Sequence, residues 1–266
     1  MTMKILITGA KGLLGEALSA YAKIEGFQVL ETDVSELDIT RSNQVRNVIR
    51  GFNPDVILNC AVIDPINSEK SPKLATKVNV IGMKNILKNK CNSKLVHFSS
   101  PAVFDGLPAL ENKQLRGDFS YGYKETDLPK PTTVYGKTKL ESEKLLEGTD
   151  SLIIRTSWLY SENQLLTRKA YATNEIARPT YCGDVWKFIV TALKEDLHGL
   201  YHVCGPDVMS RHEQAKLLFG KVKKENLPIP NIRPLSTARS FEYFKKQDQS
   251  LTYWKQFIES LRLPPK

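Results

Sequence analysis

Short apolar runs of strand length alternate with amphipathic stretches of helix length along most of the chain. The pattern predicts strands at residues 5–8, 27–31, 56–59, 94–99, 152–155 and 200–204. It predicts helices at residues 13–24, 41–50, 68–90, 134–147, 184–197, from 210 onward and at 251–261. Strands and helices that alternate at this interval form βαβ units with right-handed crossovers. We therefore expect an α/β fold, a Rossmann-like doubly wound parallel sheet with a small C-terminal substrate lobe.

Two helix starts carry specific signals, and two stretches carry none. Thr40 precedes the second helix and is expected to be its N-cap. Ser210 and Glu213 have the spacing of a capping box. Residues 101–131 and 161–180 lack a sustained period, and a loop as long as the first is usually functional in a compact domain.

The turn after the first strand has the spacing G-x-x-G-x-x-G, from Gly9 through Gly12 to Gly15. Glycine is needed where φ is positive and where a ligand must approach the backbone closely. The helix that follows offers free N–H groups and a positive dipole end to a phosphate. A strand, turn and helix with incidental glycines is the alternative, but a strand before and a helix after the turn favour a dinucleotide site.

Two residues near this turn give opposite indications about the cofactor. Asp33 follows the second strand, where a carboxylate can accept hydrogen bonds from the ribose hydroxyls of NAD. A plain turn residue is the alternative there. Lys11 lies within the glycine turn, where a cation can pair with the 2′-phosphate of NADP. Both NADP(H) and NAD(H) therefore stay open.

Tyr135 and Lys139 are spaced i and i+4, which places them on one face of a helix. We expect the ammonium to lower the pKa of the phenol, which could then give a proton to a carbonyl oxygen. With ten tyrosines in the chain, about one such match is expected by chance. The position of the pair favours a functional role over a chance match. The helix follows a strand that ends at Ser99 and Ser100, and ligands lie beyond the carboxyl ends of such strands. Ser100 could hydrogen-bond the same oxygen, or simply cap a loop.

Composition narrows the class of protein. No apolar run reaches the roughly 18 residues of a membrane span. The first strand begins almost at once, so we expect no targeting peptide and a cytoplasmic protein. The four cysteines lack metal or disulfide spacing and are expected to be reduced thiols: Cys60, Cys91, Cys182 and Cys204. Of the net charge of +9, six charges lie in residues 219–266. Without a nucleic-acid motif, this charge favours solubility or small-anion binding over nucleic acid.

Together with Asn59-Cys60-Ala61 and Asn79, these motifs resemble those of an extended short-chain dehydrogenase/reductase. Further segments narrow the resemblance to the dTDP-4-dehydrorhamnose reductase family, which reduces the 4-keto group of a dTDP-sugar. They are Leu37-Asp38-Ile39-Thr40, Pro54 to Asn59, Val103-Phe104-Asp105-Gly106, Tyr123-x-Glu125, Pro131-x-x-Val134 to Lys139 and Arg155-Thr156-Ser157-Trp158.

The resemblance implies a set of functional residues and partners. Ser100, Tyr135 and Lys139 would be catalytic. The cofactor would be held by Gly9, Lys11, Gly12, Leu13, Leu14, Gly15, Asp33, Asp38, Ile39, Cys60, Ala61, Val62, Asn79, Ser99, Tyr135 and Lys139. The substrate would contact Ser100, Val103, Phe104, Tyr135, Trp158 and Arg178. We expect a nucleotide-sugar substrate, no metal, no membrane or nucleic-acid partner, and a homodimer as a candidate assembly.

The same resemblance implies a division into domains. Residues 1–160 would form the NAD(P)-binding domain, to which 181–204 return. Residues 161–180 and 205–266 would form the substrate-binding lobe.

One departure from the family pattern concerns the sugar side of the site. An acid and an aromatic residue that normally follow the serine are replaced by Pro101 and Ala102. A second hypothesis is therefore a cofactor-binding regulatory subunit, resembling the beta subunit of methionine adenosyltransferase. A nucleotide-sugar epimerase or dehydratase is a third, although a dehydratase would want an acidic pair where Pro101 and Ala102 stand. The reductase remains favoured because Ser100, Tyr135 and Lys139 are all present.

Overall fold

A computed structural model of the chain describes residues 2–106, 122–161, 170–227, 231–247, 251–253 and 256–257. These residues fall into two compact units. The first consists of Met1–Phe104, Pro129–Arg155 and Ala192–Leu200, and the second of Asp105–Leu128, Thr156–Thr191 and Tyr201–Lys266. Residues 105–128, 156–160, 181–191 and 201–204 fall in the second unit, although the expected division assigns 1–160 and 181–204 to the NAD(P)-binding domain. That functional division stays a prediction.

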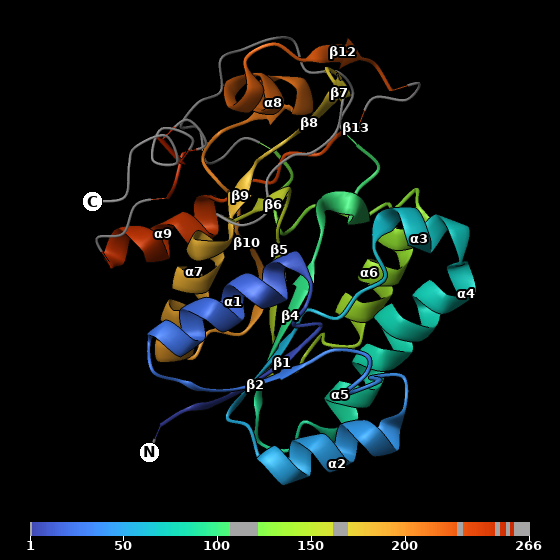
Figure 1. Cartoon of the computed structure of the whole chain (residues 1–266), viewed down its shortest axis with the longest axis vertical. Coiled ribbons are helices and arrows are strands. Elements are labelled where there is room, and N and C mark those ends of the chain that lie inside the picture. The colour runs from blue at the N-terminus through green and yellow to red at the C-terminus, as the bar shows by residue number, and fades with distance from the viewer. Residues whose placement is uncertain are drawn as a thin grey trace. The chain divides into compact units, whose positions relative to one another are not determined.

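The first half of the chain alternates strands and helices as predicted (Figure 1). Its elements are β1 (Lys4–Thr8), α1 (Leu13–Ile24), β2 (Gln28–Thr32), α2 (Ser42–Phe52), β3 (Val56–Asn59), α3 (Pro65–Lys70), α4 (Pro72–Ala75), a π-helical segment (Thr76–Gly82), α5 (Met83–Asn89), β4 (Lys94–Ser99), a 3₁₀ turn (Pro101–Val103), α6 (Val134–Lys144) and β5 (Leu152–Arg155).

The second half has shorter strands. Its elements are β6 (Leu159–Tyr160), β7 (Ala170–Ala172), β8 (Glu175–Ala177), β9 (Thr180–Tyr181), α7 (Cys182–Lys194), β10 (Gly199–His202), β11 (Met209–Ser210), α8 (Arg211–Phe219), β12 (Lys223–Glu225), β13 (Asn231–Ile232) and α9 (Ala238–Lys246).

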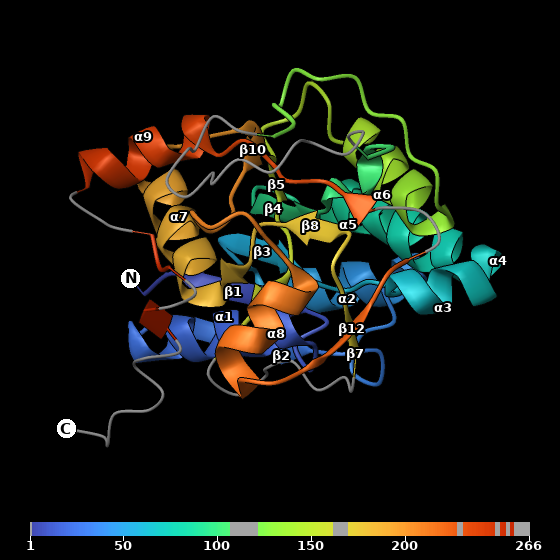
Figure 2. The ribbon, with the colours of Figure 1, turned by 90° about the horizontal axis from the view of Figure 1, so that it is seen from above.

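The main sheet has six strands in the order β10-β5-β4-β3-β1-β2. Neighbours from β2 to β5 are parallel, and Figure 2 shows β1, β3, β4 and β5 side by side. On one face, Leu6, Ile57 and Leu95 form an apolar row that packs against α2 and α5. The sequence prediction of a doubly wound α/β fold is confirmed.

Several local predictions differ from the structure. Thr40 is not the N-cap of α2: Arg41 holds that position, and the Thr40 hydroxyl donates to Asp38 at 2.7 Å. The helix expected at 68–90 begins at Pro65 and is interrupted at Ser71, because the residue before a proline is disfavoured in helical geometry. The capping box of α8 is present as predicted.

Further predictions concern residues 161–180, the C-terminal helix and the long loop. The stretch 161–180, expected to be irregular, contains β7, β8 and the start of β9. Strands of two or three residues are too short to show a period in the sequence. Most of the expected helix 251–261, and residues 107–121 of the long loop, lie outside the described residues.

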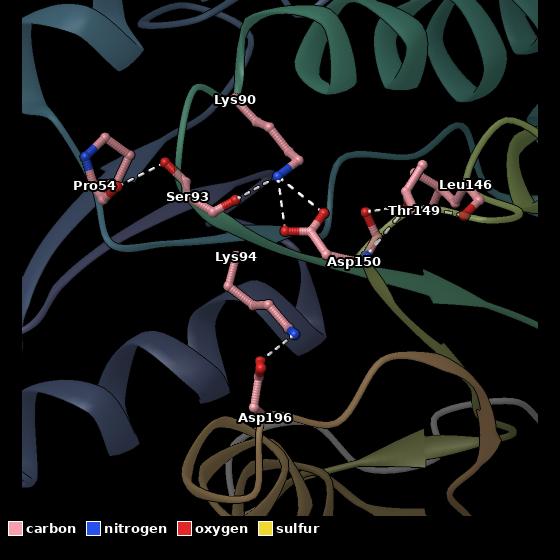
Figure 3. A network of polar contacts seen from close by, with 9 residues as sticks. Pro54, Lys90, Ser93, Lys94, Leu146, Thr149, Asp150 and Asp196 are labelled. Carbon is pink, nitrogen blue, oxygen red and sulfur yellow. Dashed lines mark hydrogen bonds and ion pairs between the residues drawn. The ribbon is translucent and has the colours of Figure 1, made fainter.

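Polar contacts join the loops at the amino ends of the strands of the main sheet (Figure 3). Ser93, just before β4, donates from its hydroxyl to the Pro54 carbonyl at 2.6 Å. Lys90 pairs with Asp150 at 3.1 Å, and Lys94 pairs with Asp196 at 2.8 Å. These contacts tie together segments that are far apart in sequence, at the sheet edge opposite to the glycine turn.

A buried ion pair fixes α6 to β5. The Arg155 guanidinium donates to both carboxylate oxygens of Glu143, at 2.8 and 2.7 Å. The two side chains are only 2% and 6% exposed, and the guanidinium also lies 5.0 Å above the Phe104 ring. Removing one partner of such a pair leaves the other charge buried without its counterion.

We therefore expect Glu143→Gln to lower the free energy of unfolding by about 3 kcal/mol or more. Urea unfolding followed by circular dichroism measures the change. Glu141→Gln changes an exposed carboxylate on the same helix and should shift the stability by no more than about 0.5 kcal/mol. Equal stabilities of the two variants would contradict a structural role for the pair.

Candidate active site

The glycine turn divides its three glycines between packing and open surface. Gly9 has φ +63°, and a Cβ there would lie 2.7 Å from the Ala61 backbone. A Cβ on Gly15 would lie 2.3 Å from the Gly9 carbonyl oxygen. Gly12 is exposed, and a Cβ there would meet nothing closer than that same oxygen at 3.4 Å. The protein's own packing therefore requires Gly9 and Gly15 but leaves Gly12 open toward a ligand.

The start of α1 has the features of a phosphate site. Gly12 is the N-cap in an extended conformation and provides no side-chain cap. The N–H groups of Leu13, Leu14 and Gly15 lie in the first turn, where no intrahelical acceptor exists. Free N–H groups and the positive end of the helix dipole fit the diphosphate of a dinucleotide.

Asp33 lies next to this turn, as predicted for a ribose contact. Its carboxylate accepts from the backbone N–H of Lys11 at 3.3 Å and of Val34 at 2.6 Å. The Lys11 ammonium lies 3.6 Å from the Glu36 carboxylate. A hydrogen bond from the Ser35 hydroxyl lowers the pKa of Glu36 to about 2, so Glu36 is charged at neutral pH. A second carboxylate, which the sequence argument missed, thus faces the cation of the turn.

The other predicted cofactor residues follow β2 and β3 in the same unit. Asp38 accepts from the Thr40 N–H and hydroxyl, and Ile39 is buried in the core. Cys60 and Ala61 are half-buried after β3, and Val62 is 40% exposed. Of these, Ile39 packs within the protein, whereas Val62 is open to a ligand.

Asn79 acts as a clamp inside the π-helical segment. Its Oδ1 accepts from the Ile63 N–H at 2.8 Å, and its Nδ2 donates to the Thr138 hydroxyl at 2.9 Å. Ile63 belongs to the loop after β3, and Thr138 lies on α6 between the two predicted catalytic residues. Asn79 therefore joins the loop after β3 to α6. π-helical turns are frequently found at functional sites.

The three predicted catalytic residues come together at the carboxyl end of β4. The Ser100 hydroxyl hydrogen-bonds the Tyr135 phenol. The Lys139 ammonium lies 6.0 Å from the centroid of the Tyr135 ring and donates to the Phe98 carbonyl at 2.7 Å. Lys139 is only 4% exposed. Ser100 also accepts from the Ala102 N–H at 3.2 Å, so it caps the 3₁₀ turn as well.

A close approach of two backbones makes this arrangement possible. A Cβ on Gly136 would lie 2.0 Å from the Ala102 carbonyl oxygen. Any larger residue at 136 would therefore push α6 away from the turn after β4. Because Tyr135 precedes Gly136 and Ser100 lies two residues before Ala102, this contact brings the two hydroxyls together.

The expected effect of Lys139 on Tyr135 is wrong for this structure. Burial raises the pKa of Tyr135 to about 12, with a smaller rise from Asp64, while the hydrogen bond from Ser100 opposes the rise. Burial also lowers the pKa of Lys139 to about 8, against the opposing effects of Glu143 and Cys60. Sequence spacing places a cation beside a phenol but does not show how far both are removed from water.

Two predicted substrate residues in this unit are turned away from solvent. Val103 and Phe104 are both 0% exposed. Phe104 packs under the Arg155 guanidinium. These two side chains pack in the core beneath the turn, and their contact with a substrate stays a prediction.

The second unit holds the remaining predicted substrate residues. Trp158 is half-buried with φ +42°, and the Arg211 guanidinium lies 3.8 Å above its ring. Arg178 is 0% exposed and donates to the Pro206 carbonyl at 2.7 Å. Its guanidinium therefore supports the loop at Pro206, and its contact with a substrate stays a prediction. Arg211 was missed because nothing in the sequence links it to Trp158.

The second unit also contains a polar cluster that was not predicted. The Tyr123 hydroxyl donates to Asp105 at 3.0 Å, and burial raises the pKa of Tyr123 to about 12. Arg233 is close enough to oppose that rise. The Tyr123 N–H donates to the Pro234 carbonyl at 2.9 Å. Nothing in the sequence connects Asp105, Tyr123 and Arg233, because they are far apart in the chain.

The chain is similar to known reductases in sequence. It is 33% identical over 261 residues to the dTDP-4-dehydrorhamnose reductase of Aggregatibacter actinomycetemcomitans, which covers 88% of this chain and 85% of the relative. It is also 29% identical over 266 residues to methionine adenosyltransferase 2 subunit beta of Xenopus tropicalis, covering 88% of this chain and 76% of the relative. The chain is thus similar to proteins named for the reductase hypothesis and for the regulatory-subunit hypothesis.

A solved structure agrees with the fold. The dTDP-4-dehydrorhamnose reductase of Bacillus anthracis, in complex with NADP, aligns with a TM-score of 0.82 and 26% identity over 98% of both chains. Residues 3–257 match the model of the family described as the RmlD substrate binding domain. The chain therefore belongs to the RmlD substrate binding domain family, as its resemblance to the dTDP-4-dehydrorhamnose reductases predicts.

Proposed function

We propose that this chain is an NAD(P)H-dependent reductase of a nucleotide-linked 4-keto-6-deoxy sugar, as the dTDP-4-dehydrorhamnose reductases among its relatives are named. The observation that carries the proposal is the pair of hydroxyls on Ser100 and Tyr135, with the Lys139 ammonium close to the phenol ring. The pair lies beyond the carboxyl end of a central strand, where ligands bind in doubly wound sheets.

The chemistry of these groups suits carbonyl reduction. A bound nicotinamide cofactor would supply the hydride. Because the pKa of Tyr135 is about 12, the phenol is protonated at neutral pH and can give its proton to the carbonyl oxygen. Ser100 would hydrogen-bond that oxygen as negative charge develops on it. Lys139, with a pKa of about 8, remains mostly charged at pH 7 and would stabilise the phenolate that is left.

The residues present fit a dinucleotide. Gly12 with the first turn of α1 would hold the diphosphate, and Asp33 would accept from the adenosine ribose. The open surface at Gly12 supports this assignment, because packing alone would allow a side chain there.

A second candidate is a cofactor-binding regulatory subunit. The observation in its favour is the Pro101-Ala102 turn, which replaces an acid and an aromatic residue expected to face a sugar. Such a protein would bind the cofactor tightly without turning over any 4-keto sugar. Turnover of a 4-keto sugar by the parent protein separates the two candidates.

The first prediction concerns cofactor binding. Gly12→Val should weaken the affinity for NADPH and NADH by at least about tenfold, because a side chain blocks approach of the diphosphate to the backbone. Fluorescence titration measures the affinity. Gly51→Val makes the same change where a Cβ meets nothing within 4 Å and should leave binding unaltered. Parental affinity in Gly12→Val would show that the site is misassigned.

The second prediction concerns the choice of cofactor. Lys11→Ala should weaken NADPH several-fold more than NADH if its ammonium meets the 2′-phosphate. Glu36→Gln should have the opposite effect, because it removes the carboxylate that partly neutralises Lys11. KM values for both cofactors measure the change. Lys23→Ala, at the far end of α1, is the control. Equal changes for both cofactors would make Lys11 and Glu36 bystanders.

The third prediction concerns the proton. Tyr135→Phe keeps the ring and removes only the acid, so kcat should fall by about 10²- to 10⁴-fold while cofactor affinity survives. NADPH oxidation is followed with dTDP-4-keto-6-deoxy-mannose made in situ. A variant as active as the parent would remove Tyr135 from the mechanism. A parent that binds cofactor but reduces no 4-keto sugar would favour the regulatory candidate.

A further inference from the structure

A row of polar side chains crosses the buried face of the sheet below the site. The strand register pairs Thr8 with Asn59, and Asn59 with His97, on the neighbouring strands β1, β3 and β4. Their exposed fractions are 1%, 3% and 1%. Two residues earlier on each strand, the same face carries the apolar row of the core. Buried polar groups are costly unless they are hydrogen-bonded, so this row calls for a complete set of partners.

The hydrogen bonds assign the proton of His97. The Thr8 hydroxyl donates to Asn59 Oδ1 at 2.7 Å. Asn59 Nδ2 then donates to Met83 Sδ and to His97 Nδ1, each at 3.2 Å. Because Asn59 Nδ2 is a donor, His97 Nδ1 must accept, and the ring proton is placed on Nε2.

The same chain of bonds continues into the helix that carries the proposed catalytic residues. His97 Nε2 lies 2.9 Å from the hydroxyl of Ser142, which is 0% exposed. The Ser142 hydroxyl in turn donates to the Lys139 carbonyl at 2.7 Å. Burial and the nearby Lys139 ammonium both lower the pKa of His97, so its ring is neutral with one donor and one acceptor. The bonds therefore run without interruption from the strand before the glycine turn to α6.

We propose that His97 is a positioning residue for the proposed reduction: it fixes α6 against β4, so that Tyr135 stays aligned with Ser100. Apolar packing resists separation of a helix from a sheet but is non-directional. A hydrogen bond from the imidazole ring of His97 is directional, so it sets the rotation of α6 and its distance from the sheet. His97 lies on β4, and Ser100 lies in the turn that directly follows β4. The hydrogen bond from His97 to Ser142 on α6 therefore keeps Tyr135, on the same helix, aligned with Ser100. The inference rests on the proposed function.

Kinetics of paired variants test this role. His97→Leu removes both hydrogen bonds, and kcat should fall by about 10- to 100-fold because small displacements at a reacting centre are costly. KM for cofactor and sugar should change by less than about threefold. His97→Gln retains a donor that can reach Ser142 and should recover most of the loss. Combining His97→Leu with Ser142→Ala should cost little more than His97→Leu alone, because both break the same chain.

A matched control separates positioning from stability. Ser93→Ala removes a buried hydroxyl at the amino end of the same strand (Figure 3), where its partner is the Pro54 carbonyl. Ser93→Ala should lower the free energy of unfolding by about as much as His97→Leu does, and it should leave kcat unchanged. Equal kcat for the parent and His97→Leu would overturn the inference. So would a His97→Gln variant as slow as His97→Leu, or a Ser93→Ala variant that loses kcat as well.

Nuclear magnetic resonance of ¹⁵N-histidine protein gives a readout that needs no substrate. The signals of His97, assigned by their loss in His97→Gln, should show a proton on Nε2 and none on Nδ1 from pH 5 to pH 8. A proton on Nδ1, or a ring that titrates in this range, would overturn the inference whatever the turnover. A parent that shows the expected tautomer but reduces no sugar would count against the proposed function alone.

Discussion

The contact between α6 and the turn after β4 is the constraint on which the site depends. Gly136 admits the Ala102 carbonyl where any side chain would collide with it. The helix can then lie close enough for Tyr135 to meet Ser100. Lys139, one turn further along α6, is buried as well, and the Phe98 carbonyl accepts from its ammonium. One missing side chain thus determines the geometry of the proposed catalytic residues.

Burial also changes how the tyrosine and lysine pair should be understood. In water, a cation beside a phenol would be expected to lower the pKa of the phenol. Here desolvation outweighs the hydrogen bond from Ser100 at Tyr135 and the charges of Glu143 and Cys60 at Lys139, so each group is held nearer its neutral form. For a reductase that direction is useful, since a protonated phenol is the form that can deliver a proton. The sequence supplies the two residues, and the depth of the site decides their protonation.

Much of the first unit could be predicted from the sequence because its signals are local and redundant. The strands Val56–Asn59, Lys94–Ser99 and Leu152–Arg155 and the helix Leu13–Ile24 begin and end where the pattern places them. Thr40 failed as a cap because Asp38 takes its hydroxyl, a choice between two neighbouring acceptors that spacing does not decide.

The predicted site was less secure where it depended on burial. Val103 and Phe104 belong to a segment that carries the family resemblance, but a motif does not say which side chains face inward. His97 shows the converse, since a lone histidine in an apolar strand has meaning only once the register places it beside Asn59. Long-range pairing of this kind is not contained in any local pattern.

The two ends of β4 serve different purposes. At its amino end, Ser93 and Lys94 bond to loops that are far away in sequence. At its carboxyl end, Ser99 leads into Ser100, one of the proposed catalytic residues. Leu95 and Val96, both 0% exposed, lie between the polar contacts of the two ends. Substitutions at the amino end of β4 can therefore alter the thermal stability of the protein without changing the reaction at the carboxyl end. Stability and chemistry are then free to evolve separately.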